Sequence, residues 1–380
     1  MNRSQETQCR CTRTEKAVFR GGPASRPNPS RLPWVDALRG CAILVMIPAN
    51  LFPYYAEPHP LWYRVLASCV APPVFIAVSA GMVVLGSRKH TLGYYVQRGG
   101  WVVLISALID LGLWGIFPFA SMDVLYLIGL GMPVAFLCRN LRVGWLCLAG
   151  ATVFAASYAL QRRFGYHVEP LVIPFGELRL PEWARLLASW LVDGWFPVFP
   201  WLGFVFLGLG LFRMIFQRDS RHLGLHLLLC GVLLVTIGMV LLLAPIPGIH
   251  NFTDGTIMQS RGGYAEIFYP PTPPYLTAAV GAVCLTTSIF LVAKKHALFG
   301  LLAFFGRHAL VIYILHQALG AWLIAPVTRL IGISKIESGF VFLMTTLAVI
   351  LAMVPACKLV DSVKARHPPK CLFLQILFGR

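Results

Sequence analysis

Four side chains suited to acyl or proton transfer lie on or just after one apolar segment near the N-terminus. Asp36, Arg39 and Asn50 fall within PWVDALRGCAILVMIPANLF, and His59 follows in the short stretch EPHPLW. A histidine can act as a base or a nucleophile near neutral pH. An amide side chain can donate a hydrogen bond to a carbonyl oxygen or its oxyanion. Charged groups inside an apolar helix cost about 2.5–3.5 kcal/mol each, so these residues are functional candidates.

A helix must position these groups, because helical spacing brings them to one face. Positions 36, 39, 43, 46 and 50 recur every three or four residues. Asn50 comes 14 residues after Asp36, about 21 Å along a helix axis, so one face carries polar groups at both membrane depths. Pro48 predicts a kink just before Asn50. A simpler interpretation stays open, in which Asp36 and Arg39 only anchor one end of the helix.

The composition predicts the class of protein that contains this helix. The chain has 380 residues, is 57% hydrophobic and only 12% charged, and has a mean hydropathy of +0.71. A soluble protein has about 25% charged residues. The apolar runs are long enough to cross a bilayer, so the sequence predicts an all-α polytopic membrane protein with about ten transmembrane helices. The expected spans are 33–53, 66–86, 98–117, 122–138, 143–160, 196–214, 224–244, 274–293, 306–325 and 339–357.

The distribution of basic residues predicts the topology. The formal net charge is +17, and most of the 32 Lys and Arg residues fall in alternate loops, the N-terminal arm and the C-terminal tail. Because basic residues favour cytoplasmic loops, both termini are expected in the cytoplasm of a multi-pass plasma (inner) membrane protein. The excess charge is then a topology signal and an attraction to anionic membrane lipids, and no nucleic-acid partner is expected.

Three regions are expected along the chain. The sequence predicts a disordered basic cytoplasmic arm at residues 1–32. The transmembrane domain is expected at residues 33–358, and a basic and apolar cytoplasmic tail at residues 359–380. The exported segment 161–195 contains PEWARLLASWLVDGW, which predicts a short amphipathic helix. Its Trp residues favour a position at the outer membrane interface, and a substrate-facing lid is the alternative.

Further polar groups fall within the expected spans. His316 and Gln317 lie near the middle of the ninth span, where a histidine serves either chemistry or hydrogen-bonded packing. Asp123 begins the fourth span, and two roles are equally compatible with it: an acid that complements the helix dipole, or a buried acid that lines a cavity. The chain contains no P-loop, dinucleotide-binding or HExxH motif, so no metal site is expected.

Four segments taken together resemble one enzyme family. They are RLPWVDALRGCAILVMIPANLFP with EPHPLW, APPVFIAVSAGM, FPVFPWLGFVFLGLGL and FGRHALVIYILHQ. In this order they are similar to the transmembrane acyltransferases of the heparan-α-glucosaminide N-acetyltransferase type, including bacterial members. The resemblance covers all ten expected spans. It implies transfer of an acyl group, usually acetyl, from cytoplasmic acyl-CoA (acetyl-CoA) to a sugar amine or hydroxyl on the far side of the membrane.

The resemblance also implies roles for individual residues. His59 matches the family's essential histidine and would act as a base or an acyl carrier, with His316 as the alternative from mid-membrane. Asn50 matches the family's asparagine and would hold the thioester carbonyl. Guanidinium groups at the cytoplasmic mouth would attract the phosphates of CoA. The expected CoA-binding residues are Asp36, Arg39, Arg98 and Arg307, and the expected substrate-binding residues are Trp62, Asp123, Trp201 and Gln317.

Two other classes of protein stay open. A transporter or flippase would use Asp36, Arg39 and His316 as relay groups, although the sequence lacks the internal repeat from which many transporters are built. A non-catalytic membrane scaffold would not explain polar residues at both depths of one helix face. For the acyltransferase, the expected acceptor is an extracytoplasmic glycan or lipid-linked sugar, and a homodimer is a candidate assembly.

Overall fold

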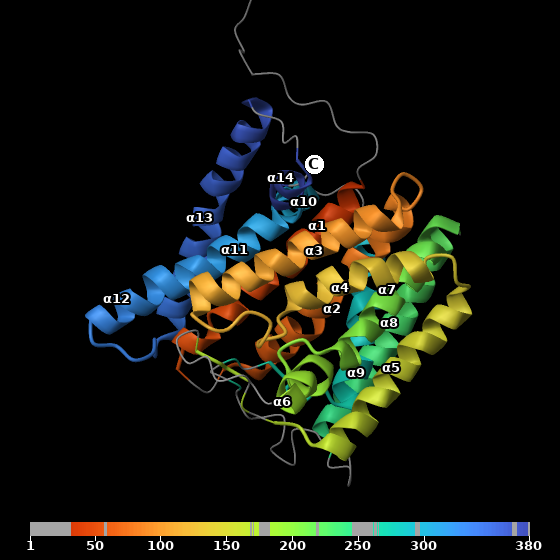
Figure 1. The fold of residues 1–380 in the computed structure, drawn as a ribbon, viewed down its shortest axis with the longest axis horizontal. Helices are drawn as coiled ribbons and strands as arrows, with labels where there is room; N and C mark the ends of the chain where they lie inside the picture. Colours follow the sequence, from red (N-terminus) through yellow and green to blue (C-terminus); the bar gives the residue numbers. More distant parts are fainter. Residues whose placement is uncertain are drawn as a thin grey trace, which may run out of the picture. The chain divides into compact units, whose positions relative to one another are not determined.

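The computed structural model describes the chain from residue 32 onward in several ranges. These are residues 32–56, 59–167, 169, 171–174, 183–217, 220–244, 261, 264, 266–292, 297–366 and 371–378. Of the expected arm 1–32, only Leu32 lies among the described residues, and the compact unit of the chain begins at Pro33. Within the described ranges the backbone forms helices and a few isolated bridges, with no β-strand (Figure 1).

The helices follow one another along the chain. The α-helices are α1 (Pro33–Asn50), α2 (Leu61–Gly86), α3 (Leu92–Ile109), α4 (Val124–Cys138), α5 (Val143–Phe164), α6 (Trp183–Ala188), α7 (Val198–Gln217), α8 (Ser220–Leu243), α9 (Pro273–Val292), α10 (Ala297–Arg307), α11 (Ala309–Leu319), α12 (Ala325–Leu330), α13 (Gly339–Arg366) and α14 (Leu372–Phe378). Short 3₁₀ and π turns extend several of them, namely η1 (Phe52–Tyr54), η2 (Asp110–Trp114), η3 (Ser189–Asp193) and η6 (Gly320–Ile324).

Membrane-spanning helices account for most of the described chain. Nine helical segments in the described ranges are long and apolar enough to cross a bilayer, and they correspond to nine of the ten expected spans. The remaining expected span, 122–138, is the shorter helix α4 of 15 residues, about 22 Å long. The prediction of an all-α polytopic membrane protein is therefore confirmed. The short helix expected within 161–195 is α6, which continues into η3.

Two expected boundaries differ from the observed helices. The ninth expected span, 306–325, is broken at His308, so Arg307 ends α10 instead of beginning a span. His308 Nδ1 donates to the carbonyl oxygen of Phe304 over 2.9 Å, and Nε2 lies 2.9 Å from Asp361 Oδ1 on α13. These contacts tie the break to α13. Helix α13 itself continues past residue 358, the expected end of the transmembrane domain.

Helix α1 contacts more of the other spans than a peripheral helix would, namely α2, α9, α10, α11 and α13. Its backbone touches that of α10. A Cβ added at Gly40 would lie 1.8 Å from a backbone oxygen of α10, and one at Gly306 would lie 1.7 Å from the carbonyl oxygen of Asp36. Glycine at both positions permits this approach. The contact also brings together the residues next to these glycines, Arg39 and Arg307.

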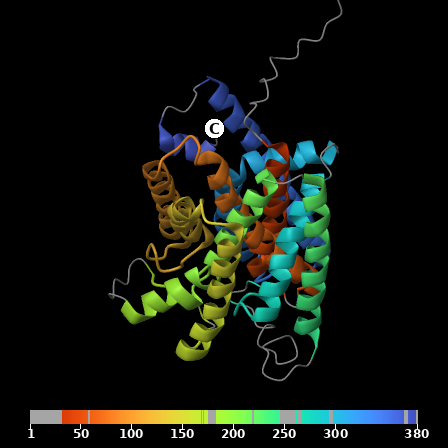
Figure 2. The ribbon, with the colours of Figure 1, turned by 90° about the vertical axis from the view of Figure 1, so that its right-hand side faces the viewer.

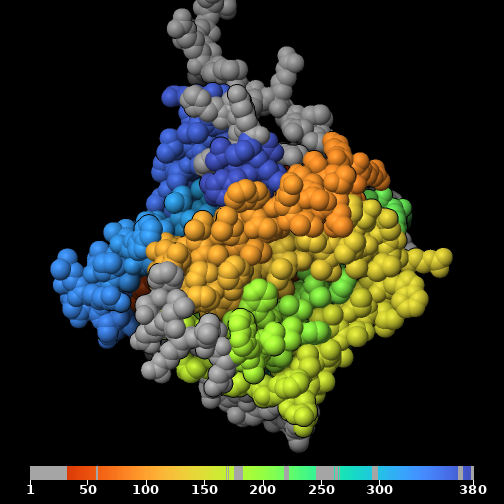
Figure 3. Space-filling model, in the orientation of Figure 1, coloured from red at the N-terminus to blue at the C-terminus, as the bar shows by residue number. Residues whose placement is uncertain are grey.

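The other helices surround this central contact. Helices α8 and α9 lie side by side along their length (Figure 2), and α5 and α2 both pack on α7. The C-terminal helix α14 contacts α3 and α11, with the rings of Phe373 and Trp101 5.0 Å apart between centroids. The space-filling view shows this segment, in dark blue, against α3, in orange (Figure 3). Helix α14 therefore lies beside two of the helices that line the cavity described below.

The close contact of α1 with α10 predicts that a single methyl group added at Gly306 destabilises the protein. Gly306→Ala should lower the midpoint of thermal unfolding in detergent, because the added Cβ forces the two backbones apart. Overpacking of this kind costs about 1–3 kcal/mol. Gly300→Ala is the matched control on the same helix, since a Cβ there meets nothing within 4 Å. A Gly306→Ala protein as stable as the Gly300→Ala protein would contradict the contact.

Candidate active site

A cavity of about 500 Å³ of water-accessible space runs along one side of α1. Side chains from α1, α2, α3, α4, α10, α11 and α14 line it, together with the loop residues around Trp195 and Glu266. Its volume is in the range typical of sites for small molecules and cofactors. Six of the residues singled out in the sequence line this cavity, and they are Arg39, Asn50, Arg98, Asp123, Arg307 and Gln317.

Three guanidinium groups lie at one end of the cavity, where α14 also contributes lining residues. Arg39 comes from α1 and Arg307 from the end of α10, and the glycine contact holds these two positions together. Arg98 comes from α3, where its Nη1 donates to the hydroxyl of Tyr94 over 3.3 Å. Three cations in the wall of one cavity produce a positive potential that attracts a multiply charged anion. Asp36 is not among the described residues that line the cavity. Its Oδ1 lies 3.9 Å from Nη1 of Arg39.

Asn50 lies further along the cavity and is held by His316. The Nδ1 of His316 is 2.7 Å from the carbonyl oxygen of Ile312, which can only accept, so Nδ1 carries the hydrogen. Nε2 then has a free lone pair, and it accepts a hydrogen bond from Asn50 Nδ2 over 2.8 Å. His316 is fully buried and is not among the described residues that line the cavity. His316 therefore fixes the orientation of the Asn50 amide, and its influence on the cavity passes through Asn50.

A buried acid, Asp110, stands at the point where α3 changes to the π-helical turn η2. Its carboxylate accepts hydrogen bonds from the hydroxyls of Ser121, at 2.9–3.0 Å, and Tyr126, at 2.8 Å. At the other end of η2, Trp114 Nε1 donates to Gln317 Oε1 over 3.2 Å. Single π-helical turns within α-helices are frequent at functional sites. Here the turn brings both Asp110 and Trp114 to the wall of the cavity.

Asp123 occupies the N-cap position of α4, but its side chain makes no capping hydrogen bond. Its carboxylate accepts a hydrogen bond from the hydroxyl of Tyr313 on α11, and both residues line the cavity. Of the two roles left open by the sequence, this geometry favours that of a buried acid in a cavity wall. The bond also links α4 to α11 across the cavity.

The wall opposite the arginine end is built from two loops rich in aromatic residues. Trp195, Tyr264, Phe268 and Tyr269 belong to this wall, together with Phe196 and Glu266. The guanidinium of Arg261 lies behind it and is completely buried. The ring centroids of Trp195 and Tyr269 are 5.1 and 5.2 Å from its central carbon, which is within the range of cation–π attraction.

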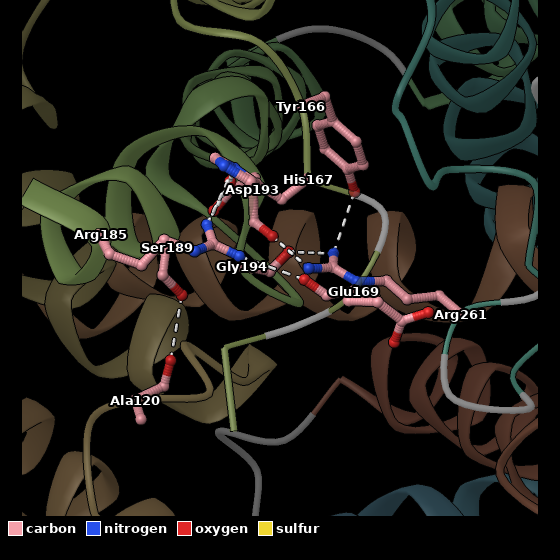
Figure 4. Close-up of polar contacts among 9 residues, drawn as sticks. All are labelled: Ala120, Tyr166, His167, Glu169, Arg185, Ser189, Asp193, Gly194 and Arg261. Carbon is pink, nitrogen blue, oxygen red and sulfur yellow. Dashed lines mark hydrogen bonds and ion pairs between the residues drawn. The ribbon is translucent and has the colours of Figure 1, made fainter. Parts of the chain in front are cut away.

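Arg261 also joins the two loops through hydrogen bonds (Figure 4). It donates to the carbonyl oxygen of Gly194 over 2.9 Å, to that of Asp193, and to the hydroxyl of Tyr166 over 3.0 Å. The carboxylate of Asp193 is buried and accepts a 2.6 Å bond from Arg185. This network holds the segment before α7 against the segment before α9, and so holds the aromatic wall in place.

Three residues selected from the sequence lie away from the cavity. His59 is buried and stacks on Phe52 with 4.4 Å between ring centroids, and neither residue is among the described residues that line the cavity. The side chain of Trp62 is 69% exposed on the outside of α2. Trp201 is fully buried in an aromatic cluster that includes Phe268. The fold thus uses Trp201 to support the aromatic wall from behind.

Asp110, Trp114 and Glu266 are among the lining residues that were not expected from the sequence. The signal for Asp110 was present, since it is a lone acid in the apolar stretch WVVLISALIDLGLWGIF. Glu266 carried no such signal, because it lies in a long loop with two other charged residues, Asp254 and Arg261. No group of three or more His, Cys, Asp or Glu side chains in the described ranges is arranged to hold a metal ion.

These features define the class of the protein as an integral membrane protein with a cavity between its helices that is lined by apolar and charged side chains. The sequence family described as "Heparan-alpha-glucosaminide N-acetyltransferase, catalytic" matches residues 31–244, more than half of the chain. The chain belongs to this family, and so to the multi-pass membrane acyltransferases. The match covers α1 to α8, whereas Glu266, Arg307, His316 and Gln317 lie beyond it. A comparison with curated proteins found no match.

The hydrogen bonds around Asp110 predict how the cavity wall responds to loss of a hydroxyl. Tyr126→Phe should destabilise the protein by about 1–3 kcal/mol, because the buried carboxylate loses a donor. Thermal unfolding in detergent measures the change. Tyr158→Phe is the matched control, since that hydroxyl accepts a 3.0 Å hydrogen bond from the exposed side chain of Arg162 on the same helix, and about 0.5 kcal/mol or less is expected there. Equal effects of the two substitutions would rule out a special role for the Asp110 network.

Proposed function

We propose that this protein transfers an acyl group, acetyl as in its family, from acyl-CoA to an amine or hydroxyl of an extracytoplasmic glycan or lipid-linked sugar. One observation carries the proposal: a single cavity joins a group of three arginines to an amide whose orientation is fixed by a histidine. The first end suits the phosphates of CoA, and the second suits a reacting carbonyl. Family membership supports the same reaction class.

The length of the cavity is compatible with an extended CoA. Arg39 comes 11 residues before Asn50 on α1, about 17 Å along the helix axis. The phosphates would bind Arg39, Arg98 and Arg307, and the pantetheine arm would follow the apolar side chains between the two ends. The thioester would then lie beside Asn50. With the arginine end at the cytoplasmic face, both termini would be cytoplasmic, as the distribution of basic residues predicts.

The proposed reaction is attack of the acceptor nitrogen or oxygen on the thioester carbonyl carbon. The carbon–sulfur bond breaks, CoA leaves as a thiol, and the acceptor loses one proton. One amide hydrogen of Asn50 is engaged by His316 Nε2, which leaves its second hydrogen for the carbonyl oxygen. Donors aimed in advance at a developing oxyanion are a large source of catalysis. In this scheme His316 is a positioning residue, because it acts through Asn50.

Replacing a cavity arginine should weaken the binding of acetyl-CoA. For Arg98→Ala and Arg307→Ala, titration of the purified protein in detergent should give a Kd raised about tenfold or more, because each substitution removes a charge-assisted hydrogen bond worth about 1.5–3 kcal/mol. Arg162→Ala, on the exposed side of α5, is the control and should bind like the wild type. If well-folded wild-type protein bound no acetyl-CoA, the proposed function would be wrong.

Replacing Asn50 should separate binding from chemistry. Asn50→Ala should retain acetyl-CoA binding and lower the transfer of radiolabelled acetyl to glucosamine about 10²–10³-fold, as loss of one oxyanion donor does. His316→Ala should lower the rate in the same direction, since the amide then loses its fixed orientation. Asn140→Ala, at an exposed turn, is the matched control.

The same assay tests the role expected for His59. Its proposed function as a base or acyl carrier stays a prediction, because the ring stacks behind Phe52. A His59→Ala protein that binds acetyl-CoA but transfers nothing would support that role. Full activity of the same variant would leave the chemistry to the residues that line the cavity.

A further inference from the structure

Glu266 is a buried carboxyl group in the wall of the cavity at the end away from the arginines. Its residue is only 6% exposed, and it lines the same cavity as Asn50. The oxygen Oε2 is shielded from solvent and has no hydrogen-bond partner among the described residues. A buried carboxyl oxygen without a donor is costly, so its retention points to an interaction that the resting protein does not supply.

The backbone beside Glu266 is anchored to a membrane-spanning helix. The hydroxyl of Ser68, in the first third of the apolar helix α2, accepts a hydrogen bond from the N–H of Ile267 over 2.9 Å and donates one to the carbonyl oxygen of Arg64 over 2.6 Å. The carbonyl oxygen of Ser68 in turn accepts the hydroxyl of Tyr275 over 3.0 Å. All of these bonds are buried. The loop therefore holds Glu266 in a defined place, as a group that takes part in catalysis requires.

The other carboxylates of the cavity are already engaged. Within the described ranges three carboxyl groups line it. Asp110 accepts hydrogen bonds from two hydroxyl groups, and Asp123 accepts one from Tyr313. The lone pair of His316 Nε2 is occupied by Asn50, and an amide such as Asn50 cannot take up a proton at neutral pH. A general base needs an open lone pair within reach of the acceptor, and Glu266 Oε2 offers one.

We propose that Glu266 is the general base of the transfer reaction, an inference that rests on the proposed function. As the acceptor nitrogen or oxygen attacks the thioester carbonyl carbon, its proton passes to Glu266 Oε2. The carbon–sulfur bond breaks, and the sulfur leaves with the bonding electron pair. The proton returns from Glu266 to solvent or to the departing thiolate, which gives the CoA thiol. No oxidant, reductant or metal ion enters this balance.

The surroundings of Glu266 suit a base that works near neutral pH. Burial raises the pKa of the Glu266 carboxyl to about 7, and the positive charge of Arg64 on α2 opposes part of that rise. The ionised form is the base, so transfer should increase as the pH rises through about 7 and fall as the pH drops below it. The other titratable groups that interact with it are Tyr63 on α2, Tyr264 and Tyr269 in its own loop, and Tyr275 on α9.

The test compares Glu266→Gln, Glu266→Asp and the control Glu169→Gln, which makes the same change at an exposed glutamate of the other loop. Each purified protein is assayed for acetyl-CoA binding and for acetyl transfer to glucosamine on both sides of pH 7. Glu266→Gln should bind acetyl-CoA like the wild type and lose about 100-fold or more in rate, together with the dependence on a group that titrates near pH 7. Glu266→Asp should recover part of the rate and keep that dependence. A structural role would instead change binding and stability.

The possible outcomes of this experiment distinguish a failure of the proposed function from a failure of the role assigned to Glu266. If the wild type binds no acetyl-CoA, the proposed function fails, and the assignment of Glu266 fails with it. If Glu266→Gln transfers acetyl at the wild-type rate, or keeps the pH dependence, only the assignment is overturned. If acetyl-CoA binds but glucosamine is not acetylated, an infrared pH titration decides. A carboxyl band that titrates near pH 7 and disappears in Glu266→Gln supports the base, and its absence overturns it.

Discussion

The backbone contact between α1 and α10 is the constraint on which the site depends. Gly40 and Gly306 let the two helices touch, and the residues next to these glycines, Arg39 and Arg307, both line the cavity. The chain then turns at His308 into α11, which runs alongside α1 and delivers His316 to Asn50. Both ends of the cavity thus follow from one helix packing. A side chain at either glycine would separate the cations and shift the amide from its partner.

Hydrogen bonding of buried polar groups explains the rest of the cavity wall. In an apolar bundle an unsatisfied donor or acceptor costs about 1–3 kcal/mol, so polar residues on spans persist where partners from other helices meet them. Asp123 and His316 have such partners on segments distant in sequence, Tyr313 and Asn50, and Asp110 is bonded by Ser121 and Tyr126 after the turn that follows η2. Glu266 Oε2 departs from this pattern among the described residues of the wall. That contrast separates the residues that build the cavity from the one proposed to act in it.

The two loops that close the cavity have a structural role of their own. Arg261 is fully buried between aromatic rings and backbone carbonyl groups, and it joins the segment before α7 to the segment before α9. The aromatic wall is therefore positioned by a cation that does not line the cavity.

The sequence by itself determined the spans, the polar face of α1 and the family, because these depend on local apolarity, helical spacing and short ordered motifs. Among the residues it suggested, Arg39, Asn50, Arg98 and Arg307 line one cavity. Only the tertiary structure shows that Asn50 meets His316, that His59 stacks on Phe52 and Trp201 packs on Phe268, and that Glu266 is buried in the cavity wall. These outcomes depend on which helices pack together across hundreds of residues. Helical periodicity does not encode that packing, because it specifies which face of a helix is polar but not which partner meets it.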